Sequence, residues 1–298
     1  MDGVLVVDKP EGPTSHDVVA AVRHAIGVRA VGHTGTLDPM ASGVLPLVIG
    51  RATRLARFLA AHDKTYDATI RLGSATDTWD RTGRAAGEST PIDRLPAPDD
   101  IRGQLTRFLG VHEQLPPPFS AKKVGGIRAH RLARNGQEVA VRPTLVTLHE
   151  LEILGVDAPL VSVRVRCSAG YYVRALAHDL GRQLGCGACL ESLRRLEAGG
   201  FTMRDAATLD DIVREPAQAA GRVVPMERLL PDLPALRLSE EDARRVAHGN
   251  AVRPAGAGAL TVAGGAGAVR LVSPDGTLLA IAFASGGAGV LHPAIVLK

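Results

Sequence analysis

The segment GHTGTLDPMASGVLP, residues 32–46, holds a single carboxylate, that of Asp38, among glycines, threonines and prolines. Asp is common in turns because its side chain hydrogen-bonds the local backbone. Here, however, conformationally special residues are dense and no lysine or arginine is adjacent. A carboxylate held in a shaped loop can act as a nucleophile or a general base. Glycosidase chemistry needs a second acid, and we expect no other acid in a comparable loop, so Asp38 is predicted to act alone.

Arg174 is the candidate partner of Asp38. It lies in the first turn of a predicted helix, whereas cations are electrostatically favoured at the other end of a helix. This position indicates a specific anionic partner, and the alternative is an ordinary arginine in water. A pair with Asp38 would keep the carboxylate ionised and lower its pKa by about 1–3 units.

Tyrosines near these residues stand out because aromatic residues make up only 3% of the chain. Tyr66 lies within a predicted strand, and Tyr171 and Tyr172 open the helix of Arg174. The usual place of a tyrosine is the hydrophobic core. A tyrosine can instead stack on a nucleobase, which contributes about 1–3 kcal/mol toward the cost of extruding that base.

Hydrophobic patterns predict the elements that position these groups. The Asp38 loop is preceded by a helix that we expect Ser15 to cap and Gly27 to end. Tyr66 falls on KTYDATIRLG, whose apolar residues alternate as in a half-buried strand. Arg174 shares its helix with a leucine stripe at residues 176, 180 and 184. The predicted strands are 3–10, 44–50, 64–73, 146–156 and 159–170, and the predicted helices are 15–27, 52–61, 99–110 and 171–185.

The pattern changes after residue 233. A helix capped by Ser239 and ended by Gly249 is followed by short strands near 259–263, 268–273 and 278–284. We therefore predict two domains, 1–233 and a small β-rich domain at 234–298. A Gly/Ala-rich loop is expected over 254–268.

Composition limits the classes of protein and of site. Of the 298 residues, 45% are hydrophobic. The chain has 35 basic and 31 acidic residues, and the resulting net charge of +4 permits a nucleic-acid partner without establishing one. Three cysteines, with one CxxC and no second ligand pair, predict reduced thiols, no metal site and a cytoplasmic location. The apolar runs are too short to cross a membrane. Three basic patches could follow a phosphate backbone or form solvated faces: residues 51, 54 and 57; residues 122, 123, 128, 131 and 134; and residues 194 and 195.

Five motifs together resemble the bacterial tRNA pseudouridine-55 synthases of the TruB family. The first is the Asp38 loop, which is similar to the catalytic loop of that family. The other four motifs are DKPEGPTSHDVV, which precedes this loop, and KTYDATIRLGSATDTWDRTG, QLPPPFSAKKVGGIRAHRLARNG, and CSAGYYVRALAHDLG with LRRL, which come after it. All five stand in family order within residues 3–203. The C-terminal segment resembles a divergent PUA-type RNA-binding domain.

This resemblance implies an α+β fold with a central mixed, mostly antiparallel sheet flanked by helices, followed by the PUA-like domain. It implies isomerisation of uridine 55 in the T-arm of tRNA, without cofactor or metal, by a monomer. Asp38 corresponds to the nucleophile and Arg174 to its partner, and Tyr66 corresponds to a tyrosine that stacks on the flipped base. Tyr172 and Leu193 correspond to pocket residues, and His33 corresponds to a histidine that helps to displace the T-loop.

Two other interpretations stay open at this point. One is a non-catalytic factor that binds or folds tRNA on the same scaffold, against which the intact set of Asp38, Tyr66 and Arg174 argues. The other is a pseudouridine synthase of the same fold that acts on a different uridine.

Overall fold

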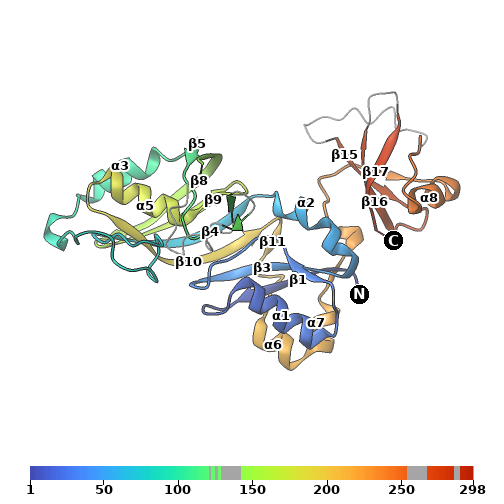
Figure 1. Cartoon of the computed structure of the whole chain (residues 1–298), viewed down its shortest axis with the longest axis horizontal. Coiled ribbons are helices and arrows are strands. Elements are labelled where there is room, and N and C mark those ends of the chain that lie inside the picture. The colour runs from blue at the N-terminus through green and yellow to red at the C-terminus, as the bar shows by residue number, and fades with distance from the viewer. Residues whose placement is uncertain (121, 125–126, 129–141, 254–266, 285–288, 298) are drawn as a thin grey trace.

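The computed structural model describes residues 1–120, 122–124, 127–128, 142–253, 267–284 and 289–297. Within these residues, one mixed and mostly antiparallel sheet crosses the larger part of the molecule (Figure 1). Its main path is β12 (Ala207–Thr208), β1 (Gly3–Lys9), β3 (Ala41–Ile49), β10 (Ala188–Ala198), β4 (Lys64–Leu72), β9 (Leu160–Cys167), β8 (Thr144–Asp157) and β5 (Gly110–Gln114). Off this path, β2 (Val31–His33) pairs with β3, β11 (Phe201–Thr202) with β10, and β13 (Val224–Pro225) with β1. The predicted α+β class with a mostly antiparallel sheet is confirmed.

The strands β1 and β3 are buried on both faces. In β1, Leu5 and Val7 belong to the main core cluster, whereas Val4 and Val6 belong to a second cluster on the opposite face. Successive side chains of a strand point to opposite faces, so a continuous apolar run indicates a strand covered on both sides. Strand β4 instead buries every second residue, as its alternation predicts.

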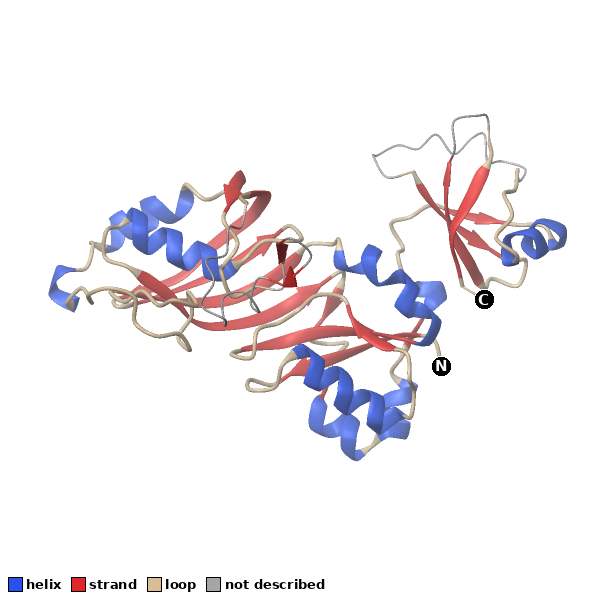
Figure 2. Cartoon of the chain, viewed as in Figure 1, coloured by secondary structure: helices blue, strands red, loops and turns tan. Residues whose placement is uncertain are grey.

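Helices gather at two ends of the sheet (Figure 2). One group is α1 (Ser15–Ile26), α6 (Leu209–Arg214) and α7 (Pro216–Gly221), and the other is α3 (Pro98–Thr106) and α5 (Val173–Gln183). Both groups pack on the main core cluster, through residues such as Val18 and Ile212 at one end and Leu105 and Leu176 at the other. The Asp38 loop contacts both groups, through Ser15 of α1 and Arg174 of α5.

Helix α1 ends at Gly27, which has a positive φ of 68° and forms the predicted C-cap. The predicted N-cap was displaced by one residue. Thr14, not Ser15, is the cap, and it forms a capping box with Asp17. The hydroxyl of Ser15 is used elsewhere: it is buried and donates to the carbonyl of Leu37 while accepting from the amide of the same residue. Ser15 therefore holds the segment immediately before Asp38.

The predicted helix 52–61 is only partly correct. Residues 50–55 form a 3₁₀ helix (Gly50–Leu55), and only α2 (Ala56–Ala60) is α-helical. Short 3₁₀ helices Ile92–Arg94 and Met226–Arg228 and the two-stranded pair β6 (Lys123–Val124) and β7 (Ile127–Arg128) complete this part of the described chain. The hairpin β8–β9 and helix α5 were predicted, although Leu184 follows the last residue of α5.

The C-terminal segment folds around its own four-stranded sheet in the described residues, in the order β14 (Ala235–Arg237), β15 (Ala268–Val272), β16 (Leu278–Ala284) and β17 (Leu291–Val296). Helix α8 (Glu240–Ala247) packs on it, with Ser239 as its N-cap as predicted. The strand expected at 259–263 and most of the expected loop lie outside the described residues. The domain boundary near residue 234 and the PUA-like assignment stay predictions.

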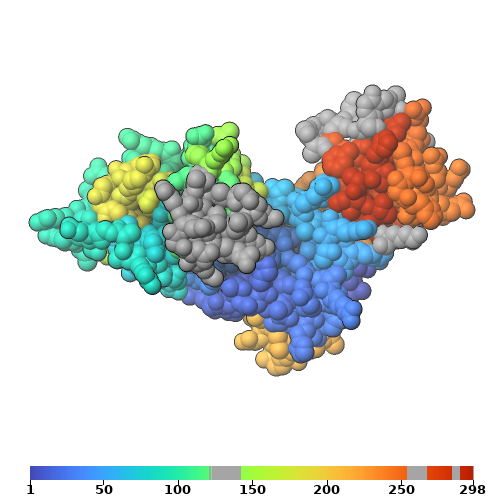
Figure 3. All heavy atoms as spheres, viewed as in Figure 1, coloured from blue at the N-terminus to red at the C-terminus, as the bar shows by residue number. Residues whose placement is uncertain are grey.

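The C-terminal sheet shares an apolar cluster with the main body. Leu278, Ile281 and Leu297 lie in the same cluster as Val4 and Leu55. The rings of Phe58 and Phe283 stack across the junction, with centroids 6.4 Å apart. Figure 3 shows the C-terminal part seated against the segment of α2. Among the described residues, no helix has the length and apolar character needed to span a bilayer.

Candidate active site

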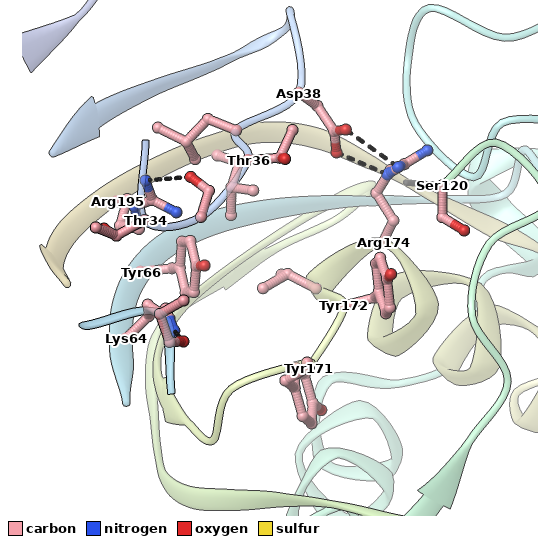
Figure 4. Close-up of a pocket in the computed structure, with 16 residues that line it drawn as sticks. Thr34, Thr36, Asp38, Lys64, Tyr66, Ser120, Tyr171, Tyr172, Arg174 and Arg195 are labelled. Carbon is pink, nitrogen blue, oxygen red and sulfur yellow. Dashed lines mark hydrogen bonds and ion pairs between the residues drawn. The ribbon is translucent and has the colours of Figure 1, made fainter. Parts of the chain in front are cut away.

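A cavity of about 260 Å³ opens between the Asp38 loop and the start of α5 (Figure 4). Its wall combines a loop, a sheet and a helix terminus, and it holds three tyrosines. The lining residues are Thr34, Gly35, Thr36, Leu37, Asp38, Ala60, Lys64, Tyr66, Ser120, Gly170, Tyr171, Tyr172, Val173, Arg174, Leu193 and Arg195. This cavity contains five of the six residues predicted for the site.

The backbone around Asp38 is held on both sides by side chains that the active-site prediction did not include. Ser15 bonds Leu37 on one side, with N···O and O···O distances of 2.8 and 3.0 Å. On the other side, the ammonium of Lys9 donates to the carbonyls of Pro39 and Ala41 at 3.4 and 2.6 Å. Lys9 is fully buried, and burial lowers its pKa to about 8. The loop is therefore ordered by buried polar contacts, which offset the entropy lost in fixing it.

The carboxylate of Asp38 meets the guanidinium of Arg174 as the sequence predicted. Nε of Arg174 lies 2.9 Å from Oδ2, and Nη2 lies 3.2 Å from Oδ1. The same guanidinium donates to the carbonyls of Thr78 and Phe119 at 3.0 and 2.9 Å. Arg174 is 5% exposed, whereas the side chain of Asp38 keeps 31% of its surface open. The arginine is thus fixed inside the protein, and the acid faces the cavity.

A second acid, Asp80, lies beside this pair, although no other acid was expected in a comparable loop; that Asp38 acts alone as the nucleophile stays a prediction. Oδ2 of Asp80 is 3.5 Å from Nη1 of Arg174, and Asp80 is buried. Its Oδ1 accepts from the hydroxyls of Thr78 and Thr82 at 2.8 and 2.6 Å. Sequence analysis missed Asp80 because the segment DTWDRTG is typical of an ordinary polar turn. Trp79 in this segment has a positive φ of 65°, but this backbone conformation is visible only in the structure.

The net effect on the acidity of Asp38 is opposite to the predicted one. Burial raises the pKa of Asp38 and outweighs the opposing effect of Arg174. The negative charge of Asp80 raises the pKa of Asp38 further, while Lys9 lowers it. A carboxylate with a raised pKa is a stronger base and nucleophile when ionised than one held low by a salt bridge alone.

The tyrosines occupy different walls of the cavity. Tyr66 comes from β4 and is 8% exposed, and burial raises the pKa of its phenol, so the ring is neutral. Tyr172 is the N-cap of α5, and its backbone is held by Gln114, which accepts from its amide at 2.8 Å and donates to its carbonyl at 3.1 Å. Sequence analysis missed Gln114, and its position in QLPPPF was the only available signal. Leu193 of β10 also lines the cavity and lies opposite Ala68 in the pairing of β10 with β4.

His33 does not line the cavity. It ends β2 directly before Thr34, and its ring meets that of His16 edge to face, with centroids 5.2 Å apart. It therefore lies at the root of the Asp38 loop, on the side of α1.

Several arginines of the basic patches have partners within the protein, and their role in phosphate binding stays a prediction. Arg195 is 1% exposed and lines the cavity, and Arg194 pairs with Asp8 at 2.8 Å. Arg51 pairs with Asp2 and donates to the carbonyl of Leu297, and Arg54 donates to the carbonyl of Val296. Arg51 and Arg54 thus link the main body to the end of the chain, whereas Arg195 faces the cavity. Most side chains of the patch at 122–134 lie outside the described residues.

The described residues contain no group of three or more His, Cys, Asp or Glu side chains placed to hold a metal ion. All three cysteines are buried free thiols. Burial raises the pKa of Cys186 and of Cys189, so their thiols are protonated at neutral pH. The described lining of the cavity presents a carboxylate, phenols, hydroxyls and cations.

Known proteins of the same kind match over most of the chain. Residues 23–173 match the family described as "TruB family pseudouridylate synthase (N terminal domain)", and residues 174–231 match "tRNA pseudouridylate synthase B C-terminal domain". The tRNA pseudouridine synthase B of Thermobifida fusca (strain YX) is 46% identical over 291 residues, which cover 94% of each protein.

Two solved structures are similar over 99% of the chain and 85% of their own chains. A Cbf5-Nop10-Gar1 complex has a TM-score of 0.74 at 28% identity. An H/ACA RNP bound to a substrate RNA that contains 2'-deoxyuridine has a TM-score of 0.72 at 26% identity.

Proposed function

Because the chain belongs to the TruB family of pseudouridylate synthases, we propose that it isomerises uridine 55 in the T-arm of tRNA, with Asp38 as the nucleophile. The activity of the family is pseudouridine formation in tRNA. The position in tRNA and the roles of individual residues are the proposal. The observation that carries it is the bidentate pair of Asp38 and Arg174 at the edge of a cavity walled by tyrosines.

The target base has to leave the RNA stack before it can reach Asp38. Extrusion of a base requires a few kcal/mol, and stacking on an aromatic ring returns about 1–3 kcal/mol. We assign this stacking to Tyr66, with Leu193 and Tyr172 closing the rest of the cavity. His33, at the root of the loop, is assigned to contact with the part of the RNA that the base leaves.

The remaining groups prepare Asp38 for attack on the nucleotide. Arg174 orients the carboxylate through two of its nitrogens and is itself fixed by the carbonyls of Thr78 and Phe119. Asp38 needs no proton transfer to become a nucleophile once it is ionised. The uracil is released from C1′, turns within the cavity and bonds again through C5, so the reaction consumes no co-substrate. We expect the enzyme to act as a monomer in the cytoplasm, where its three free thiols would stay reduced.

The test uses unmodified tRNA and position mapping of pseudouridine. Wild-type protein is expected to modify uridine 55, whereas Asp38→Asn is expected to bind the same tRNA with unchanged affinity and to form no pseudouridine. Substantial turnover by Asp38→Asn would exclude the nucleophile assignment. Modification outside the T-loop alone would favour a synthase for another uridine, and binding without any modification by wild type would favour a non-catalytic factor.

A further inference from the structure

Two cations, Lys64 and Arg195, lie together beside Tyr66, on the side of the cavity away from Arg174 (Figure 4). Lys64 begins β4, and Arg195 lies opposite Tyr66 in the pairing of β10 with β4. Both are buried, with 8% and 1% of their surface exposed. Burial, together with the positive charge of Arg195, lowers the pKa of Lys64 to about 8.

This cluster has no carboxylate of its own. Buried charges in proteins are normally paired, because desolvation of an uncompensated charge is unfavourable. In the described residues, neither Lys64 nor Arg195 forms a salt bridge with an acid. The nearby acid Asp63 is engaged by Arg166 at 2.9 Å and by His149 at 3.4 Å.

Backbone carbonyls accept only some of the hydrogen bonds that the two cations can donate. Lys64 donates to the carbonyls of Ala60 and His62 at 2.6 and 2.5 Å, which uses two of its three N–H groups. Arg195 donates to the carbonyls of Val44 and Gly35 at 2.6 and 3.1 Å through Nε and Nη2. These bonds anchor the side chains, but carbonyl dipoles do not neutralise two full charges.

The Asp38 loop leaves space next to the cluster at Gly35. A Cβ at this position would lie 3.7 Å from Nη1 of Arg195 and 3.8 Å from Cε of Lys64. A side chain at residue 35 would therefore extend over the cations, whereas glycine leaves them in contact with the cavity that both residues line.

We propose that Lys64 and Arg195 form an anion subsite that receives an oxyanion of the extruded nucleotide. This inference rests on the proposed function. Two parts of the nucleotide carry such an oxygen. One is the phosphodiester that flanks the target. The other is the uracil ring itself: when the C1′–N1 bond breaks, its electron pair leaves with the base, and the charge spreads over N1, O2 and O4. In this route a bond from Asp38 to C1′ forms as the C1′–N1 bond breaks. When C5 then bonds to C1′, the carboxylate of Asp38 leaves with the electron pair, the C5 proton departs and N1 takes up a proton.

The test replaces Lys64 with glutamine, whose amide can still donate to the two carbonyls. Affinity for tRNA is measured in an Asp38→Asn background across a salt series, and single-turnover rates are measured in the wild-type background. If the anion is the phosphodiester, affinity falls about tenfold and the slope of log affinity against log salt becomes smaller by about one. If it is the uracil, affinity is unchanged and the rate falls at least tenfold.

Conservative variants separate charge from structure. Lys64→Arg is expected to regain at least half of the lost affinity or rate. Arg195→Lys keeps the charge but loses the fork to Val44 and Gly35, and it is expected to retain more activity than Arg195→Met. Arg164→Gln is the matched control, because this exposed arginine on the adjacent strand β9 pairs with Asp67. It should change neither quantity more than twofold.

The inference is overturned if Lys64→Gln stays within twofold of wild type in both affinity and rate. It is also overturned if the losses follow a lower melting temperature and Lys64→Arg does not restore them, since that is the behaviour of a purely structural residue. Failure of the proposed function is distinct: wild-type protein itself would then leave uridine 55 unmodified.

Discussion

Replacement of Arg174 by lysine tests whether the fork of this arginine organises the active site. Arg174 reaches four acceptors: the carboxylates of Asp38 and Asp80 and the carbonyls of Thr78 and Phe119. The ammonium of a lysine has three N–H groups on one atom, so at least one acceptor must lose its donor.

The structure gives the expected magnitude. Loss of one charged hydrogen bond costs about 1.5–3 kcal/mol, and a buried carbonyl left unpaired costs about 1–3 kcal/mol. We expect Arg174→Lys to lose about 3 kcal/mol in its free energy of unfolding, which lowers the melting temperature by about 6–12 °C. A carboxylate displaced by about 1 Å reduces the rate about 100-fold.

Calorimetry and a single-turnover assay of pseudouridine formation measure the two effects. Arg182→Lys is the control, since Arg182 lies on the same helix and its side chain is 71% exposed. It should melt and react as wild type does. Wild-type stability together with wild-type rate in Arg174→Lys would refute the reasoning.

A double-mutant cycle extends this test. Arg174→Met leaves the carboxylates of Asp38 and Asp80 without their shared cation, and removal of one partner from a buried pair costs about 3–5 kcal/mol. Adding Asp80→Asn removes one of the two like charges. The double variant is therefore expected to be more stable than the sum of the single effects predicts, and strict additivity would contradict a shared cation.

Three further predictions concern acidity, the entry to α1 and metals. Asp80→Asn removes a charge that raises the pKa of Asp38. Because Asp38 acts when ionised, the rate falls as the pH drops through the pKa of Asp38. The acid limb of the pH–rate profile should therefore lie at lower pH in Asp80→Asn than in wild type. An unmoved limb would show that the two acids do not interact. Thr14→Ala removes the capping box with Asp17 and should lower stability by about 1 kcal/mol, or about 2–4 °C by calorimetry, with an unchanged rate; a reduced rate would mean that the cap also positions the loop. Treatment with EDTA should leave turnover unchanged, since the described residues hold no cluster suited to a metal, and lost activity restored by zinc would overturn this expectation.

Local chemistry made much of the fold predictable. Gly27 ends α1 and Ser239 caps α8 because these signals act within a few residues of the chain. The conformation of residues 50–55 was harder to predict, because the sequence has the spacing of an α-helix. In the structure Arg51 pairs with Asp2, Arg54 donates to the last strand, and the segment forms a 3₁₀ helix. Such contacts join distant parts of the chain and leave no local pattern.

The candidate site divides in the same way. Asp38, Tyr66 and Arg174 were predicted partly because each is unusual for its position: an acid in a rigid loop, an aromatic in a chain poor in aromatics, and a cation at the disfavoured end of a helix. Their roles came from the resemblance of the surrounding motifs to the TruB family. Asp80 and Gln114 were missed because an acid in a polar turn and a glutamine at the end of a strand are ordinary. Their importance comes only from what the fold places next to them.

The apolar cluster that joins the two ends of the chain has a mechanical consequence. Leu297 belongs to the same apolar cluster as Val4, and Arg51 donates to its carbonyl, so the C-terminal sheet is held against the main body by packing and a hydrogen bond. These contacts set the distance between the tyrosine-lined cavity and that sheet in the structure. An RNA duplex that contacted both the cavity and the C-terminal sheet would have to span the distance between them. Removal of the last few residues would weaken the contacts that hold the sheet without altering any group in the cavity.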